Sequence, residues 1–174
     1  MTDWREVARG YSWLVWQTVY RLLGNPEDAA DCFQETFLAA LHVSRRERVA
    51  NWAGLLRQIA TRKALDALRE RSRRSRINGD PPDWTTVASS NPGPVQEAEA
   101  AELSARLRAA LSELPSQHAE VFCLRFMSDV SYREIGRILG LRQSAVGVIL
   151  HRARERLRDV LSPENVIPDV EVSQ

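Results

Sequence analysis

The sequence predicts an all-α protein, built as two small helical domains joined by a flexible linker that contains proline and glycine. Apolar residues recur at every third or fourth position in several segments, as in helices that bury one face. This period is lost at residues 77–96, where four prolines and two glycines occur. We therefore expect domains at residues 1–76 and 97–161, followed by a loose acidic tail at 162–174.

The first domain is expected to contain three helices, at about residues 4–23, 26–42 and 51–76. Gly24 is expected to end the first helix, because glycine commonly follows the last residue of a helix. Asn25 and Pro26 are typical of an N-cap and a first helical position, so they predict the start of the second helix. The third helix is expected to run into the arginine-rich segment RERSRRSR.

The second domain is expected to contain a helix-turn-helix. Ser131 and Glu134 have the spacing of a capping box, which starts a helix directly after Ser131, and Gly140 ends that helix. Another amphipathic helix follows, and Gly136 lies where the two must pack closely. Helical bundles that bind no DNA contain the same arrangement. DNA is favoured here because residues 142–158 hold five arginines and one glutamate.

Several function classes are not expected from this sequence. No apolar run is long enough to cross a bilayer and neither end resembles a signal peptide, which predicts a cytoplasmic protein without membrane insertion. Cys32 and Cys123 are isolated in apolar helical patterns, so burial is expected. No metal-ligand spacing, catalytic triad or glycine-rich phosphate motif occurs. We expect no enzyme, catalytic residue, metal, cofactor or small-molecule substrate.

Charge is segregated along the chain although its net value is only +1. Asp31, Gln34 and Glu35 share one face of the second helix, which suits either a basic partner or an ordinary solvated surface. Residues 57–76 carry eight basic side chains against two acidic ones. The basic loop before them leads to Trp52, an arrangement that suits single-stranded nucleic acid, although Trp52 is equally suited to a core position.

Three segments resemble, in order, the two conserved domains of the extracytoplasmic-function (ECF) group of bacterial sigma factors in the sigma-70 family. They are DAADCFQETF, then NWAGLLRQIATRKALDALR, then LRAALSELPSQHAEVFCLRF with the helix-turn-helix. The resemblance implies a factor that binds core RNA polymerase and directs promoter recognition and opening in transcription initiation. It also implies an anti-sigma factor that would hold the two domains together and hide both DNA surfaces.

The resemblance assigns three sets of site residues. Residues expected to dock on the clamp helices of the polymerase largest subunit are Asp31, Gln34, Glu35 and Phe37. Residues expected to melt the minus-ten promoter element and hold a flipped base are Arg45, Arg46, Arg48, Asn51, Trp52, Arg57, Arg62 and Lys63. Residues expected to read the minus-thirty-five duplex are Arg142, Gln143, Ser144, Gly147, Val148, His151, Arg152 and Arg154.

Two departures from the family pattern leave alternatives open. Arg62 stands where the family usually has asparagine, which replaces a two-way hydrogen-bonding amide with a pure donor. Gly147, Val148 and Ile149 replace polar residues of the recognition helix, so this helix either reads thymine methyls and DNA shape or binds a regulator. The alternative functions are a stand-alone helix-turn-helix regulator and an adaptor that acts through protein contacts.

Overall fold

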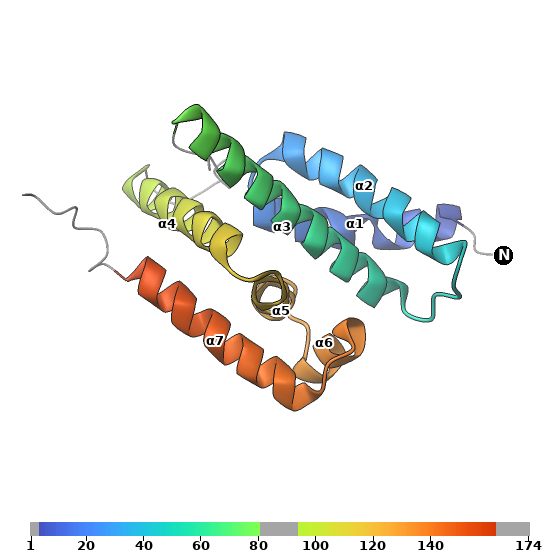
Figure 1. The fold of residues 1–174 in the computed structure, drawn as a ribbon. Coiled ribbons are helices and arrows are strands. Elements are labelled where there is room, and N and C mark those ends of the chain that lie inside the picture. The colour runs from blue at the N-terminus through green and yellow to red at the C-terminus, as the bar shows by residue number, and fades with distance from the viewer. Residues whose placement is uncertain (1–3, 81–93, 163–174) are drawn as a thin grey trace, which may run out of the picture.

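The computed structural model describes residues 4–80 and 94–162, and these ranges contain helices but no strand. The all-α prediction is therefore confirmed (Figure 1). The helices are α1 (Trp4–Leu23), α2 (Pro26–Ser44), α3 (Trp52–Asn78), α4 (Pro94–Glu113), α5 (Ser116–Phe126), α6 (Tyr132–Leu139) and α7 (Gln143–Leu161).

Local side-chain chemistry sets the boundary between α1 and α2. Gly24 has a φ of 73°, a left-handed conformation that glycine adopts without steric cost. The side-chain oxygen of Asn25 then accepts a 2.9 Å hydrogen bond from the backbone N–H of Asp28, and Pro26 occupies the first turn of α2. These interactions confirm the boundary predicted from the sequence.

Helix α3 is longer than the sequence pattern indicates. It ends at Asn78, two residues beyond the expected boundary at 76, and Gly79 caps it with a φ of 73°. Helix α4 begins at Pro94. Proline is tolerated at the first position of a helix, because the backbone N–H that it lacks would have no hydrogen-bond partner there. The rest of the predicted linker, at 81–93, and the predicted tail from 163 onward lie outside the described residues.

Helices α6 and α7 form the predicted helix-turn-helix. The Ser131 hydroxyl accepts the N–H of Glu134 at 3.3 Å, and Gly140 ends α6 with a φ of 67°. At Gly136, an added Cβ would lie 2.6 Å from the carbonyl oxygen of Leu141 in the turn. Only glycine allows this approach of the turn to α6, so the turn geometry depends on Gly136.

The two halves of the chain pack together in this structure rather than standing apart. Helix α3 lies between α1 and α2 on one side and α4, α5 and α6 on the other (Figure 1). One apolar cluster includes Leu56 and Leu65 of α3 together with Leu111 of α4 and Ala119 of α5. The Arg108 Nε of α4 also donates a 2.8 Å hydrogen bond to the carbonyl of Leu22 at the end of α1.

Both cysteines are buried, as the sequence predicted, and remain free thiols. Burial raises the pKa of Cys32 to about 11, and the nearby carboxylates of Glu35 and Asp31 add to this effect. Burial also raises the pKa of Cys123. Both thiols are therefore protonated at neutral pH, which makes them poor nucleophiles.

Within residues 4–80 and 94–162, no helix meets the length and apolarity needed for a membrane span.

Substitution of Gly136 with alanine is expected to lower the free energy of unfolding by about 1–3 kcal/mol, because the new Cβ would collide with the Leu141 carbonyl. Gly10→Ala is the matched control, since no atom lies within 4 Å of its added Cβ and alanine favours a helix. Urea denaturation followed by circular dichroism measures both changes. Equal stability of Gly136→Ala and wild type would contradict the close approach.

Candidate nucleic-acid interface

The predicted polymerase-binding residues lie together on α2. Asp31, Gln34 and Glu35 are exposed, and their spacing puts them on one helical face. Phe37 is half-buried, and its ring lies 5.1 Å from the ring of Phe33, measured between centroids. The face is thus polar and acidic along its exposed part and aromatic along its edge.

An apolar groove lies beside this acidic face, between α1 and α2. Its lining residues are Trp4, Ala8, Ser12, Phe33, Gln34, Phe37, Leu38 and Leu41. Leu38 is 57% exposed and lies one turn beyond Gln34. The sequence analysis missed Leu38, since a leucine in an amphipathic helix is expected in the core. Its exposure depends on how α1 and α2 pack.

Lys63 connects the acidic face to α3. Its Nζ lies 2.9 Å from Oε2 of Glu35, and this hydrogen bond raises the pKa of Lys63. Asp28 of α2 and Arg71 of α3 form another ion pair, and they line the same polar pocket as Glu35 and Lys63. The predicted DNA-binding residue Lys63 and the predicted polymerase-binding residue Glu35 therefore neutralise each other in this structure.

The loop between α2 and α3 forms a basic pocket of about 660 Å³. Its arginines Arg45, Arg46 and Arg48 are exposed, as expected for residues that bind phosphate. Trp4 and Leu41 supply apolar surface to the same pocket. Guanidinium groups around an apolar surface suit a nucleotide whose base has left the stack. Trp4 was not predicted, because it is distant from the loop in sequence.

Asn51 and Trp52 have structural roles at the start of α3. The Asn51 side-chain oxygen accepts the N–H of Gly54 at 2.9 Å and so caps the helix. The Trp52 ring meets the Trp4 ring edge-on, with centroids 5.3 Å apart and an interplanar angle of 82°. Trp52 therefore packs against the core of the first domain, which was one of the two roles considered for it.

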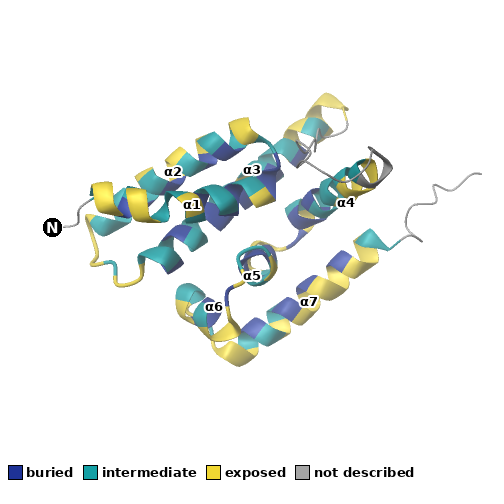
Figure 2. Ribbon diagram, turned by 180° about the vertical axis from the view of Figure 1, so that it is seen from behind, coloured by how far each residue is buried: buried dark blue, intermediate teal, exposed yellow. Residues whose placement is uncertain are grey.

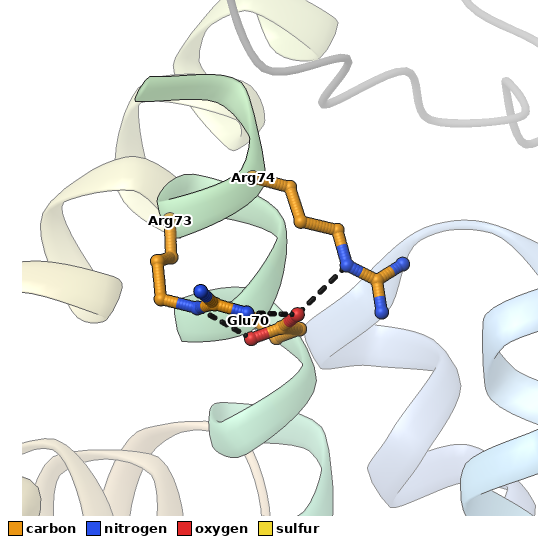
Figure 3. A network of polar contacts seen from close by, with 3 residues as sticks. All are labelled: Glu70, Arg73 and Arg74. Atoms are coloured by element: carbon orange, nitrogen blue, oxygen red, sulfur yellow. Dashed lines mark hydrogen bonds and ion pairs between the residues drawn. The ribbon is translucent and has the colours of Figure 1, made fainter. Parts of the chain in front are cut away.

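Several of the basic side chains at residues 57–76 of α3 are paired with carboxylates. Glu70 accepts hydrogen bonds from Arg73 and Arg74, as Figure 3 shows, and these lower the pKa of Glu70 to about 2. Arg69 pairs with Asp66 at 3.2 Å, one turn earlier in the same helix. Three of the eight basic side chains at 57–76 are therefore paired with the two carboxylates of the same segment.

Arg62 pairs across the two halves of the chain. Its Nε lies 2.7 Å from Oε1 of Glu120 in α5, and the Glu120 side chain is only 8% exposed. Burial raises the pKa of Glu120, whereas the hydrogen bond from Arg62 lowers it. Arg57, by contrast, is half-buried on α3. The residues assigned to the minus-ten element therefore do not form one surface: the arginines of the loop line its pocket, Lys63 faces α2 and Arg62 faces α5.

Helix α7 presents most of its predicted reading residues to solvent (Figure 2). The exposed members are Arg142, Gln143, Ser144, Val148, His151, Arg152 and Arg154. Gly147 is half-buried, and an added Cβ there would lie 3.9 Å from the Tyr132 ring. Val146, Leu150 and Leu157 are buried on the opposite side. The structure thus brings this set together on one surface, with Val148 51% exposed.

Comparison with known proteins identifies both halves of the chain. Residues 7–74 match the sigma-70 region 2 family, and residues 104–157 match the sigma-70 region 4 family. The chain is 35% identical over 162 residues to the ECF RNA polymerase sigma factor SigE of Mycolicibacterium smegmatis, covering 93% of this chain and 63% of SigE. It is 30% identical over 148 residues to the ECF sigma factor SigM of Bacillus subtilis, covering 80% of this chain and 86% of SigM.

A solved structure has a similar fold. The sigma factor RpoE of Bartonella quintana, in complex with the anti-sigma factor NepR, matches with a TM-score of 0.56 and 19% identity, over 94% of this chain and 99% of RpoE. The matched regions 2 and 4 define the class as a sigma-70 factor, with most of α1–α3 in the first region, and the second half of α4 together with α5, α6 and most of α7 in the second. Within that class the chain belongs to the ECF group of sigma factors.

Substitution of Asn51 with alanine is expected to lower the free energy of unfolding by about 1 kcal/mol, because the N–H of Gly54 loses its capping oxygen. Asn51→Ser keeps a capping oxygen and is expected to restore most of that stability, while removing the amide. Chemical denaturation of both variants measures the cap. Equal loss in the two variants would show that the amide itself, rather than the cap, stabilises this helix start.

Proposed function

We propose that this protein binds core RNA polymerase and directs it to promoters, which it helps to open. The acidic α2 face with its neighbouring groove would contact polymerase, and the basic loop pocket would hold a base of the minus-ten element. The exposed face of α7 would read the minus-thirty-five duplex. These surfaces bind rather than catalyse, so we assign no catalytic residue to the chain.

The observation that carries this proposal is the acidic α2 face beside an apolar groove, on the same bundle as the basic loop pocket. A stand-alone helix-turn-helix regulator needs only the α6–α7 surface and leaves the α2 face without a role. A partner helix with basic and apolar residues fits the charge and shape of the α2 face. The proposal places the protein in the cytoplasm, where promoter DNA is available.

An anti-sigma factor is a further proposed partner. The similar fold of the Bartonella quintana sigma factor was solved with such a partner bound. The exposed apolar side chains of Leu38 in α2 and Val148 in α7 offer contacts that a protein could cover. An anti-sigma factor that covers them would block both the polymerase-docking face and the reading face.

Alanine substitution of Asp31, Gln34 and Glu35 together is expected to weaken binding to core polymerase by about tenfold or more, because the docking face loses its charge and hydrogen-bond acceptors. Fluorescence anisotropy with purified core polymerase measures the affinity. The matched control replaces Glu99 and Glu102 of α4, which are also exposed acidic residues, with alanine. Equal affinities for the triple variant and the control would contradict the assignment of this face.

The same polymerase supports a direct test of the function on a pool of randomised promoters. Transcripts that depend on the added protein and share two spaced upstream motifs would establish sigma activity. Core binding without any dependent transcript would favour the adaptor function. Absence of core binding would overturn the proposal and favour a stand-alone regulator.

Val148 is expected to contact a thymine methyl in the minus-thirty-five element, because it is an exposed aliphatic side chain surrounded by Ser144, His151 and Arg152. Deoxyuridine in place of the contacted thymine removes only that methyl, and about fourfold lower affinity is expected from about 0.8 kcal/mol per buried methyl. Val148→Ala should abolish this difference. A difference that persists in Val148→Ala would assign the methyl contact to another residue.

A further inference from the structure

One face of α3 is covered by the second half of the chain. Gly54 lies at its start, where an added Cβ would lie 3.2 Å from Cγ1 of Ile138 in α6. Further along, Arg62 meets Glu120 of α5. Helices α5 and α6 therefore occupy the side of α3 that carries Arg62, the residue in the position where the family pattern usually has asparagine.

The contact between Arg62 and Glu120 lies at the rim of this interface. The Glu120 side chain is 8% exposed, whereas the Arg62 side chain remains 57% exposed. A buried carboxylate needs its cation, because an unpaired charge away from water is strongly disfavoured. The guanidinium, however, remains within reach of a competing anion. Replacement of Glu120 by a phosphate would thus exchange one acceptor for another of the same charge sign.

Helix α3 also carries buried polar atoms. Within the described residues, Thr61 Oγ1 and Arg69 Nη2 are buried and have no hydrogen-bond partner. These residues are eight positions apart and so lie on the same side of α3. A buried polar atom without a partner raises the free energy of the packed structure, because it has lost its contact with water and gained no hydrogen bond. Arg69 lies near Glu120, whose pKa its positive charge lowers, so the Arg62–Glu120 contact sits beside a polar group that this packing leaves unsatisfied.

We infer that α5 and α6 form an intramolecular docking surface for the promoter-facing side of α3, and that Glu120 holds Arg62 in place of a DNA acceptor. The free protein is then closed, and minus-ten DNA competes with Glu120 for Arg62. This inference rests on the proposed function, because it takes α3 as a DNA-binding helix. The α7 reading face is exposed in the closed arrangement, so duplex binding does not require opening.

The two cysteines allow opening to be measured in the full chain. Cys123 is fully buried on α5, three residues after Glu120, whereas Cys32 is buried within the first bundle. Opening of the α3–α5 interface is expected to expose Cys123 and leave Cys32 protected. The rate of iodoacetamide alkylation at each cysteine, followed by peptide mass spectrometry, therefore separates opening from unfolding.

Glu120→Arg places like charges against Arg62 and Arg69, and about tenfold faster alkylation of Cys123 is expected. Tighter binding of a fluorescent pool of short single-stranded DNA is expected as well. Glu113→Arg is the matched control, because Glu113 of α4 also pairs with an arginine of α3, Arg76, but is exposed. It makes the same change of charge without affecting the Arg62 contact.

A charge exchange tests the pair directly. Arg62→Glu alone is expected to accelerate Cys123 alkylation and to weaken single-stranded DNA binding. Combination with Glu120→Arg is expected to restore the protection of Cys123 but not the binding of DNA. This double variant also decides the matter if Glu120→Arg alone unfolds the chain, which alkylation of Cys32 would reveal.

The outcomes distinguish the inference from the proposed function. Equal Cys123 alkylation in Glu120→Arg and Glu113→Arg, with no recovery in the charge exchange, would overturn the closed arrangement. Faster alkylation with DNA binding no tighter than in Glu113→Arg would overturn the assignment of the covered face to nucleic acid. If the wild-type protein did not bind core polymerase, the proposed sigma function would be refuted, but the alkylation result would still stand.

Discussion

Helix α3 packs on two sides, and the placement of the two halves of the chain relative to each other depends on this double contact. One side packs on α1 and α2, and another meets α4, α5 and α6 (Figure 1). The helix also carries eight basic residues between 57 and 76. Such a helix can be enclosed only if its charges find partners. Carboxylates on four helices, including Asp28 of α2, Glu113 of α4 and Glu120 of α5, provide them.

These pairs connect stability with binding. Arg62 and Lys63 are in the set expected at the minus-ten element, yet each holds a carboxylate in this structure. Exchange of an intramolecular carboxylate for a DNA phosphate conserves the charge pairing, so the net free energy of exchange is smaller than the strength of either contact. Arg62 can therefore stabilise the packing of the two halves of the chain and still be available for the DNA contact that we propose.

The helix-turn-helix depends much less on its surroundings. Ser131, Gly136 and Gly140 determine its start, its close approach and its turn through contacts within a few residues. Its reading face is on the outer side of α7 and is not covered by the first bundle. The surface that we propose to read duplex DNA is therefore exposed, whereas Arg62, which we propose to contact the minus-ten element, is paired with the second half of the chain.

The sequence by itself determined the helices and most of their ends, because caps such as Asn25 and Ser131 act over three residues and glycines act on their own backbone. It also determined which residues share the α2 face and the α7 face, since helical spacing is local. Only the tertiary structure decided that Arg62 meets Glu120, that Trp4 joins the loop pocket and that Leu38 stays exposed. Such contacts join residues far apart in the chain, and they depend on the relative placement of whole helices rather than on any local pattern.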